Sequence, residues 1–322
     1  MNILMSYAYA DEKSTWILKT MRENGCKILI DSGAFTAFNA HINVSLDGYC
    51  AWLKKSIGCY DEYIALDVIG SEDETQKSYR RMISSGFSPM GVVTIDDSPS
   101  VAKMYVEDNP RICVAGGAFG SSCLSWFPAR MELISRITDH ECSIHGLGFT
   151  PNGYDGKTCA KTVDSSSWKS GRRFGNIAYW DSSTSTLATK PWKKITAETM
   201  PDSLAKSLMM SNIDSVKLNE NTRRISRMKC SVIDTVSIAA WLLRMISARR
   251  LHGQDVYLAC IPDDLEDLLV IATNFNSDGS VNFEKIDAER GHVLRELKKQ
   301  SVVAKRYIQK ALDNYWAVSN EY

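Results

Sequence analysis

The stretch KILIDSG at residues 27–33 contains the pattern that predicts the fold. A short apolar run is followed directly by an aspartate and a glycine-containing turn. An apolar run of this length, without polar alternation, is typical of a strand buried on both faces of a sheet. Similar runs recur through the first half of the chain, at residues 2–6, 63–66, 90–93, 112–115, 143–147 and 160–163.

Helical segments, such as residues 12–24 and 71–85, separate these runs. Strands that alternate with helices at this spacing predict an α/β protein with a parallel sheet, and seven or eight such units favour a (β/α)8 TIM barrel over an open sheet. Two segments qualify as the eighth strand, residues 176–179 and 256–260.

The pattern changes in the second half of the chain. Residues 181–189 are rich in Ser and Thr and predict a loop or hairpin, while residues 236–250 and 289–315 look helical. We therefore expect a barrel core with the active site in residues 1–190. Residues 191–322 are expected to form a basic insertion and a mostly helical C-terminal extension, which can supply the last barrel strand.

The composition is that of a soluble globular protein. The chain has 322 residues, of which 44% are hydrophobic and 24% charged, and its apolar runs are far shorter than the ~18 residues of a membrane helix. Nine dispersed cysteines without a CxxC pair fit reduced thiols better than a disulfide framework or a zinc site. No motif for ATP or a redox cofactor is present. We expect no cofactor, no membrane association and a cytoplasmic protein, in the host cytoplasm if phage-encoded.

Charge is distributed unevenly although the net charge is zero. Residues 165–254 hold 15 Lys and Arg against 6 Asp and Glu, a local net charge of +9. A basic segment of this kind would attract a polyanion such as a nucleic acid, although a solvated face that balances acidic neighbours explains it equally well.

Polar residues gather where the predicted strands end. Asp31, Asp67 and Asp164 each follow an apolar run, and Gly116-Gly117 follows another. In a barrel these positions share the carboxyl-terminal face, where barrel enzymes hold their active sites. Each aspartate alone fits a helix N-cap or a turn. Together they favour a site, because carboxylates around an anomeric carbon can serve as nucleophile and as proton donor in glycosyl transfer.

The order of these motifs resembles the guanine transglycosylases, barrel enzymes that exchange guanine in tRNA or phage DNA for a 7-deazaguanine. The match covers roughly residues 25–180 and consists of five motifs in the family's order. They are IDSGAF at 30–35, ALD at 65–67, AGGA at 115–118, GLGFTP at 146–151 and VDSSSW at 163–168, the last followed by Gly171-Arg172-Arg173.

The resemblance implies roles for the matched residues. Asp164 would attack the sugar C1′ and expel guanine, leaving a glycosyl-enzyme ester, and Asp31 would transfer protons on the departing and arriving bases. Asp67 would hold the Watson–Crick edge of the base. The rest of the base pocket would consist of Ser32, Gly116, Gly117 and Thr94, which stands where bacterial members carry a glutamine.

Cationic and aromatic residues follow the predicted nucleophile. We interpret Lys169, Arg172 and Arg173 as phosphate contacts, with surface charge as the alternative. Trp168 could stack on an extruded base or pack against the barrel rim. His145, inside the sixth strand, fits a core or lining histidine better than a catalyst.

The chain departs from the tRNA enzymes in lacking their Cys-x-Cys-x-x-Cys…His zinc site, so we expect no metal. The motifs at 31–35 and 163–168 are more similar to the 7-deazaguanine DNA transglycosylases of phages and bacteria. We therefore expect a DNA guanine transglycosylase that takes a free base such as 7-cyano-7-deazaguanine. The alternatives are the same reaction on tRNA, a non-catalytic nucleic-acid-binding subunit of a base-modification complex, and an unrelated barrel glycosidase acting on free nucleosides or sugars. A homodimer or a partner subunit is compatible with each of them.

Overall fold

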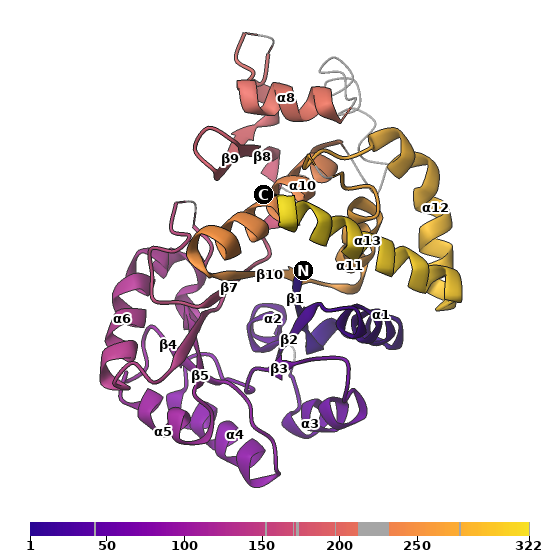
Figure 1. Cartoon of the computed structure of the whole chain (residues 1–322). Helices are drawn as coiled ribbons and strands as arrows, with labels where there is room; N and C mark the ends of the chain where they lie inside the picture. Colours follow the sequence, from indigo (N-terminus) through magenta and orange to yellow (C-terminus); the bar gives the residue numbers. More distant parts are fainter. Residues whose placement is uncertain are drawn as a thin grey trace.

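The computed structural model (Figure 1) describes residues 1–322 apart from residues 42, 152, 170, 172–173, 197, 212–231, 277 and 322. Its centre is an eight-stranded, all-parallel, curled sheet in the order β3-β2-β1-β10-β7-β6-β5-β4. The α/β class with a parallel sheet is thus confirmed. The strands are β1 (Asn2–Ser6), β2 (Lys27–Asp31), β3 (Glu62–Tyr63), β4 (Gly91–Thr94), β5 (Arg111–Ala115), β6 (Ser143–Gly146), β7 (Thr162–Ser165) and β10 (Asp255–Cys260).

The edge strands of the sheet, β3 and β4, follow each other in the chain. One parallel bridge pairs Ile64 with Met90, just beyond β3 and just before β4. Two backbone hydrogen bonds accompany it, from the Ala65 nitrogen to the Met90 oxygen and from the Met90 nitrogen to the Tyr63 oxygen, both 2.9 Å long. The two edges therefore approach each other at this level of the sheet.

Helices connect the first six strands and cover the outside of the sheet. They are α1 (Glu12–Glu23), α2 (Ala34–Ala40), α3 (Leu46–Lys55), α4 (Glu72–Ser84), α5 (Val101–Asp108) and α6 (Phe127–Ile137), with 3-10 turns η1 (Tyr7–Tyr9) and η2 (Gly117–Trp126). Local sequence sets where they begin. The Asp11 carboxylate accepts a hydrogen bond from the Ser14 nitrogen at 2.7 Å, and the Ser14 hydroxyl accepts one from the Asp11 nitrogen at 2.9 Å, which together form a capping box for α1.

The eighth strand comes from the C-terminal part of the chain. Of the two candidate segments, residues 256–260 lie in β10, between β1 and β7 in the sheet. Residues 176–179 lie in β8 (Asn176–Asp181), which pairs antiparallel with β9 (Thr186–Pro191) in a separate hairpin. A division at residue 190 therefore leaves the parallel sheet without its eighth strand, since β10 comes after it.

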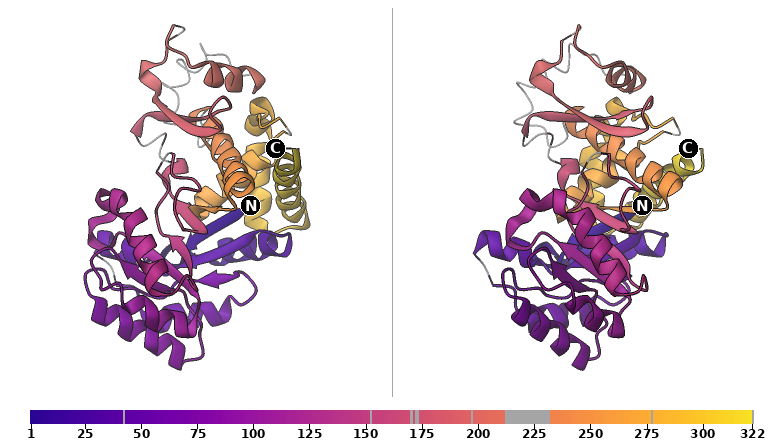
Figure 2. Two further views of the ribbon diagram at one scale, coloured as in Figure 1. Left: turned by 60° about the vertical axis from the view of Figure 1, so that its left-hand side comes forward. Right: turned by 90° about the vertical axis from the view of Figure 1, so that its left-hand side faces the viewer.

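Two further helical groups complete the fold (Figures 1 and 2). The hairpin, η4 (Trp192–Lys194) and α8 (Asp202–Met210) lie together at one end of the molecule, beside α10 (Val232–His252). Behind β10, the C-terminal helices pack on one another and on α1. They are α11 (Pro262–Ala272), α12 (Phe283–Lys299) and α13 (Val302–Glu321). One helix over residues 289–315 was the wrong expectation, because Gln300 has a φ of 52° and ends α12.

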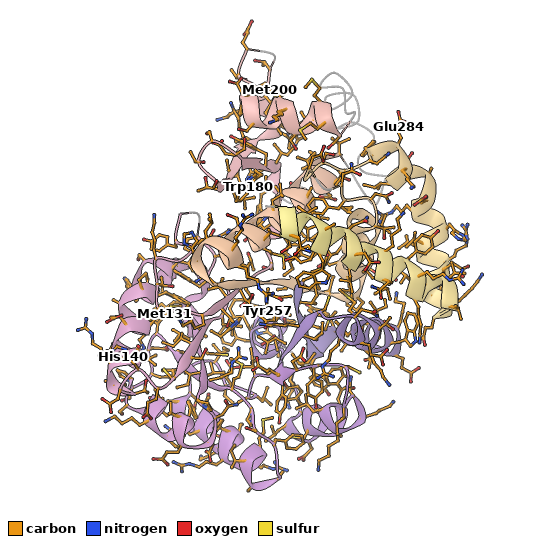
Figure 3. All side chains as sticks on the ribbon, viewed as in Figure 1. Met131, His140, Trp180, Met200, Tyr257 and Glu284 are labelled. Carbon is orange, nitrogen blue, oxygen red and sulfur yellow. The ribbon has the colours of Figure 1, made fainter. Side chains whose placement is uncertain are left out.

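Buried side chains from different strands meet on the inner face of the curled sheet. Leu4, Leu29, Val92, Cys113 and Tyr257 belong to one buried cluster. Tyr257, labelled at the centre of Figure 3, also places its ring edge-on to His145, with ring centroids 5.9 Å apart. Because side chains alternate faces along a strand, residues two positions beyond these also point inward. This rule places the side chain of Asp31, two residues after Leu29, on the inner face.

Membrane insertion can be addressed from the helices. No helix among the described residues combines the length and apolar character needed to cross a bilayer. The long, buried α10 carries Asp234, Arg244, Arg249 and Arg250 within its bounds, and its buried side chains pack on the hairpin and on β10.

Gly91 at the start of β4 gives a test of this packing. A Cβ added there would lie 2.2 Å from Cγ of Tyr105, which is buried on α5. Gly91→Ala should therefore force the ring aside and lower the free energy of unfolding by about 1–3 kcal/mol, as measured by urea denaturation.

Gly291 supplies a control for the same chemical change. It is exposed on α12, and the nearest atom to an added Cβ is the end of the Arg295 side chain at 3.5 Å. Gly291→Ala should raise the free energy of unfolding by about 0.5–1 kcal/mol, because alanine favours helix. Equal effects of the two substitutions would contradict the packing of Tyr105 on β4.

Candidate active site

Three aspartates predicted from the sequence lie at the carboxyl ends of the parallel strands. Asp31 is the last residue of β2, and Asp164 lies inside β7, one residue before its end. Asp67 comes four residues after the two-residue β3. Asp67 and Asp164 are buried and Asp31 is partly buried. None of them is an N-cap, since α2 begins after Gly33 and α4 after Ser71, so the helix-cap explanation for these aspartates is excluded.

The protonation of Asp31 indicates that the three carboxyl groups share one neighbourhood. Burial, followed by the negative charges of Asp67 and Asp164, raises the pKa of Asp31 to about 7, against an ordinary value of 3.8. The Gly33 nitrogen, which donates to Oδ2 of Asp31 at 3.1 Å, opposes part of this shift. Two like charges act on Asp31 from different strands, so the site holds a carboxyl group that titrates near neutral pH.

Asp67 is held by the polar turn that follows β2. The hydroxyl of Ser32, which is fully buried, donates to Oδ1 of Asp67 at 3.3 Å. Burial is the main reason that the pKa of Asp67 rises to about 6, while its own backbone and Ser32 oppose the rise. The structure therefore brings Ser32 and Asp67 together, as the sequence predicted.

Asp164 is held through one of its two oxygens. Oδ1 accepts hydrogen bonds from the Gly148 nitrogen at 2.7 Å and from Nε2 of His145 at 3.2 Å. The other ring nitrogen of His145 lies 2.8 Å from the Thr162 hydroxyl. Oδ2 receives no hydrogen bond from the described residues, so its lone pairs are available for attack.

The contact between His145 and Asp164 is a feature of the candidate site that sequence reasoning missed. His145 was expected to be a core or lining residue, and it is fully buried. The signal was present, since strands β6 and β7 pair His145 with Thr162 in register. Asp164 is two residues further along β7 and therefore points to the same face.

A buried arginine fixes the loop that carries Gly148. Arg244 of α10 makes a two-point contact with Asp155, with nitrogen-to-oxygen distances of 3.0 and 2.6 Å. It also donates to the carbonyl oxygen of Thr150 at 3.2 Å. The loop after β6 is thereby tied to α10, and the Gly148 nitrogen is held toward Asp164.

Thr94 and the glycine turn form a neighbouring wall. The Thr94 hydroxyl donates to Oδ1 of Asp96 at 2.7 Å, so it is already bound within the protein. Gly117, with φ of 56°, passes so close that an added Cβ would lie 2.7 Å from the same Asp96 oxygen. Gly116 lies between β5 and η2. The exposed Asp96 is a fourth carboxylate beside this wall, and the sequence analysis did not single it out.

Of the residues predicted to contact phosphate, Lys169 is placed differently from the expectation. The ammonium group of Lys169 lies 2.6 Å from Asp267 and 3.4 Å from Asp264. Although burial works against it, these carboxylates raise the pKa of Lys169. Lys169 is thus an internal partner of α11 and not a free phosphate contact. Arg172 and Arg173 lie outside the described residues.

The aromatic residues near the predicted nucleophile are packed inside the protein. Trp168 is 1% exposed, and its ring nitrogen donates to the Ala259 carbonyl at 2.9 Å. Tyr179 and Trp180, the latter labelled in Figure 3, are buried in β8, which packs against α10. The packing alternative holds for these rings.

Two cavities among the described residues lie away from the three aspartates. One of about 200 Å³ is bounded by the hairpin, α10 and the turn after β7, and includes Ser167, Ser237 and Trp241. Another of about 350 Å³ lies among α11, α12 and α13. Neither is lined by the three aspartates, which therefore form a cluster at the strand ends rather than the wall of either cavity. No group of three or more His, Cys, Asp and Glu side chains within the described residues is arranged to hold a metal ion.

The raised pKa of Asp31 leads to a prediction about stability. An acid whose pKa is higher in the folded than in the unfolded protein destabilises the fold increasingly as the pH rises from about 4 to 7. Asp31→Asn removes this charge, so it should raise the melting temperature more at pH 8 than at pH 5. The corresponding difference in free energy is on the order of 1–3 kcal/mol.

Thermal melts of both proteins at the two pH values check this prediction. Asp287→Asn, at an exposed position of α12, is the matched control and should show no such pH-dependent gain. An equal rise in melting temperature at pH 5 and pH 8 would mean that the pKa of Asp31 is not raised in the folded protein.

No protein-family model matches the chain, nor does any of the curated proteins compared with it. The functional argument therefore depends on the chain's own residues. These are a carboxyl group that titrates near neutral pH, two buried carboxylates beside it, and a histidine that fixes one of them. They lie where parallel α/β proteins hold their active sites.

Proposed function

We propose that the protein is a DNA guanine transglycosylase, which replaces guanine by a 7-deazaguanine base through a glycosyl-aspartate intermediate. The observation that carries the proposal is the placement of Asp31, Asp67 and Asp164 at the carboxyl ends of parallel strands, where burial and the charges of Asp67 and Asp164 raise the pKa of Asp31. The proposal includes closure of the eight parallel strands into a (β/α)8 barrel, supported by the bridge between Ile64 and Met90. It also makes the protein a pentosyltransferase.

In the first step Asp164 Oδ2 attacks C1′ of the target nucleotide. A bond forms between Oδ2 and C1′ while the bond from C1′ to N9 breaks, and its electron pair leaves with the guanine. Asp31, in its neutral form, donates a proton to the departing base. Hydrogen bonds from Gly148 and His145 to Oδ1 orient the carboxylate and direct the other oxygen at the sugar.

In the second step the incoming base occupies the place that guanine left. Ionised Asp31 takes the N9 proton of the 7-deazaguanine, N9 attacks C1′, and the ester bond to Asp164 breaks. The carboxylate of Asp67 accepts hydrogen bonds from the N–H groups on the Watson–Crick edge of either base. One proton moves onto Asp31 and one moves off, so each turnover restores the starting state.

DNA as the polymer is supported by the motifs at residues 31–35 and 163–168. A duplex hides both C1′ and the base edge, so the target nucleotide must be extruded or unpaired to reach Asp164. The free base would be 7-cyano-7-deazaguanine or a relative. The Thr94 hydroxyl is bonded to Asp96, so Asp96 is positioned to affect which substituent at position 7 is accepted.

A covalent adduct tests the nucleophile. Wild-type protein mixed with a guanine-containing DNA oligonucleotide should gain the mass of the oligonucleotide less one guanine, as seen by intact-protein mass spectrometry. Asp164→Asn should abolish the adduct, because an amide oxygen is a poor nucleophile. Asp287→Asn serves as the control and should form the adduct normally.

Two results would contradict the proposal. An Asp164→Asn protein that still forms the adduct would place the nucleophile elsewhere. Failure of the wild-type protein to form an adduct with DNA or tRNA, or to exchange labelled guanine into either, would exclude the reaction. If the label entered tRNA but not DNA, the proposed reaction would be retained and the substrate would be tRNA instead of DNA.

The pH dependence of the first step tests the roles of the other two aspartates. Asp67 must be ionised and Asp31 protonated, and their pKa values are about 6 and about 7. The rate constant for adduct formation at limiting substrate should rise through about pH 6 and fall above about pH 7. Asp31→Asn should remove the falling limb and lower the rate by about 10²–10⁴-fold. A falling limb that persists in Asp31→Asn would assign it to another group.

A further inference from the structure

The exposed aromatic side chains of the protein are confined to the segments that follow strands at the carboxyl end of the sheet. In the described part of the chain, every strongly exposed aromatic ring lies after β1, β2, β5, β6 or β7, before the next strand. We call this set the aromatic rim. It consists of Tyr9 after β1, Phe35 and Phe38 after β2, Phe119 and Trp126 after β5, Tyr154 after β6 and Phe174 after β7.

The rim is attached to the same backbone turns that carry the candidate site. Phe35 lies on α2, four residues after Asp31, and is 51% exposed. Trp126, which is 54% exposed, ends the η2 turn that begins at Gly117. Its ring meets that of Phe119 edge-on, with ring centroids 5.9 Å apart. These large apolar surfaces are costly to leave in water, and they lie in the segments that follow the strands, as the carboxylates of the candidate site do.

The neighbours of the rings favour a nucleic acid over a protein as the occupant. Asn39 beside Phe38, and Ser122 and Ser125 beside Trp126, are exposed polar residues. Apolar rings separated by polar residues differ from the continuous apolar centre of a protein interface. Separate exposed rings are what unpaired bases stack on, because every base presents a flat face.

Two features of the charge distribution are compatible with a polyanion as the ligand. Asp31 is half neutral near pH 7 because of its raised pKa. Exposed Lys193 and Lys194 lie in η4, directly after the hairpin, and exposed Lys206 lies on α8. Because Tyr179 and Trp180 of the hairpin are buried, they cannot stack on a base, and the exposed rings of the aromatic rim are the ones that can.

We infer that the aromatic rim binds unpaired nucleotides flanking the target guanosine, so that the preferred substrate is a single-stranded or locally opened segment of DNA. The inference rests on the proposed function for the identity of the polymer. Stacking of neighbours on the rim holds the strand open while the target base enters the carboxylate cluster. A closed duplex offers no free base faces and should bind more weakly.

The test measures binding without chemistry. Asp164→Asn protein is titrated with one fluorescein-labelled, guanine-containing DNA oligonucleotide, as a single strand and as a duplex, and binding is followed by fluorescence anisotropy. We expect the single strand to bind at least tenfold more tightly. Adding Phe35→Ala or Trp126→Ala should weaken single-strand binding by about fivefold to hundredfold, while Phe35→Trp, which keeps a stacking face, should restore it.

Ile57→Ala is the matched control. Ile57 is 73% exposed in the turn that leads into the amino end of β3, away from the rim, and its removal should leave the dissociation constant within about twofold. Equal binding of single strand and duplex, or no loss in either rim variant, would overturn the inference. Sedimentation of a dimer that Phe35→Ala converts to a monomer would instead assign the rim to a second copy of the chain.

The result can be separated from that of the proposed function. Adduct formation by the wild-type protein, together with rim variants that bind normally, would retain the transglycosylase and reject the rim. Rim variants that lose single-strand binding in a protein that never forms an adduct would retain the rim and reject the reaction.

Discussion

Repulsion among carboxylates is the constraint on which the site depends. Asp31, Asp67 and Asp164 are brought together at strand ends where water is scarce, and three full negative charges there would oppose folding. The protein meets this constraint in two ways. Asp31 holds its proton up to about pH 7, and Asp164 is stabilised by the Gly148 nitrogen and the His145 ring. The same arrangement that limits stability leaves one carboxyl group, Asp31, that keeps its proton near neutral pH and another, Asp164, whose orientation is fixed by hydrogen bonds.

The supporting shell extends outward from Asp164. Gly148 can donate because its loop is tied to α10 through Arg244 and Asp155. The Arg244 side chain is buried, and its guanidinium group lies over the ring of Trp241, 4.8 Å from the ring centroid. Helix α10 therefore links the site to the hairpin that packs on the same helix. Through these contacts a change in the hairpin can alter the position of Asp164.

Much of the fold could be predicted from the sequence because buried parallel strands leave a simple pattern. The seven apolar runs all correspond to strands or to the residues beside them, and residues 256–260 form the eighth. Boundaries were less predictable. Asp67 lies well past a two-residue strand and Asp164 lies within one, because hydrogen-bond register, not apolarity, decides where a strand ends. The break at Gln300 is a backbone conformation that hydrophobic periodicity does not encode.

The candidate site was predicted in part for the same reason. Aspartates at strand ends can be located from sequence, whereas the partners of a charged side chain depend on distant segments. Lys169 forms an ion pair with Asp267, which is almost a hundred residues away in the chain, and no local sequence pattern predicts that pairing. Whether an aromatic side chain is exposed is likewise decided by tertiary structure. Phe35 and Trp126 are exposed, whereas Trp168 and Trp180 are buried.

The position of β10 affects how the chain can be made. Strands β1 and β7 both pair with it, so during synthesis β1 remains without this partner until about 250 further residues, including the hairpin and α10, have emerged from the ribosome. During that interval the nascent protein presents unpaired strand edges on both sides of the gap. Such edges recruit other chains, so chaperone protection during synthesis would be needed most between the emergence of β7 and that of β10.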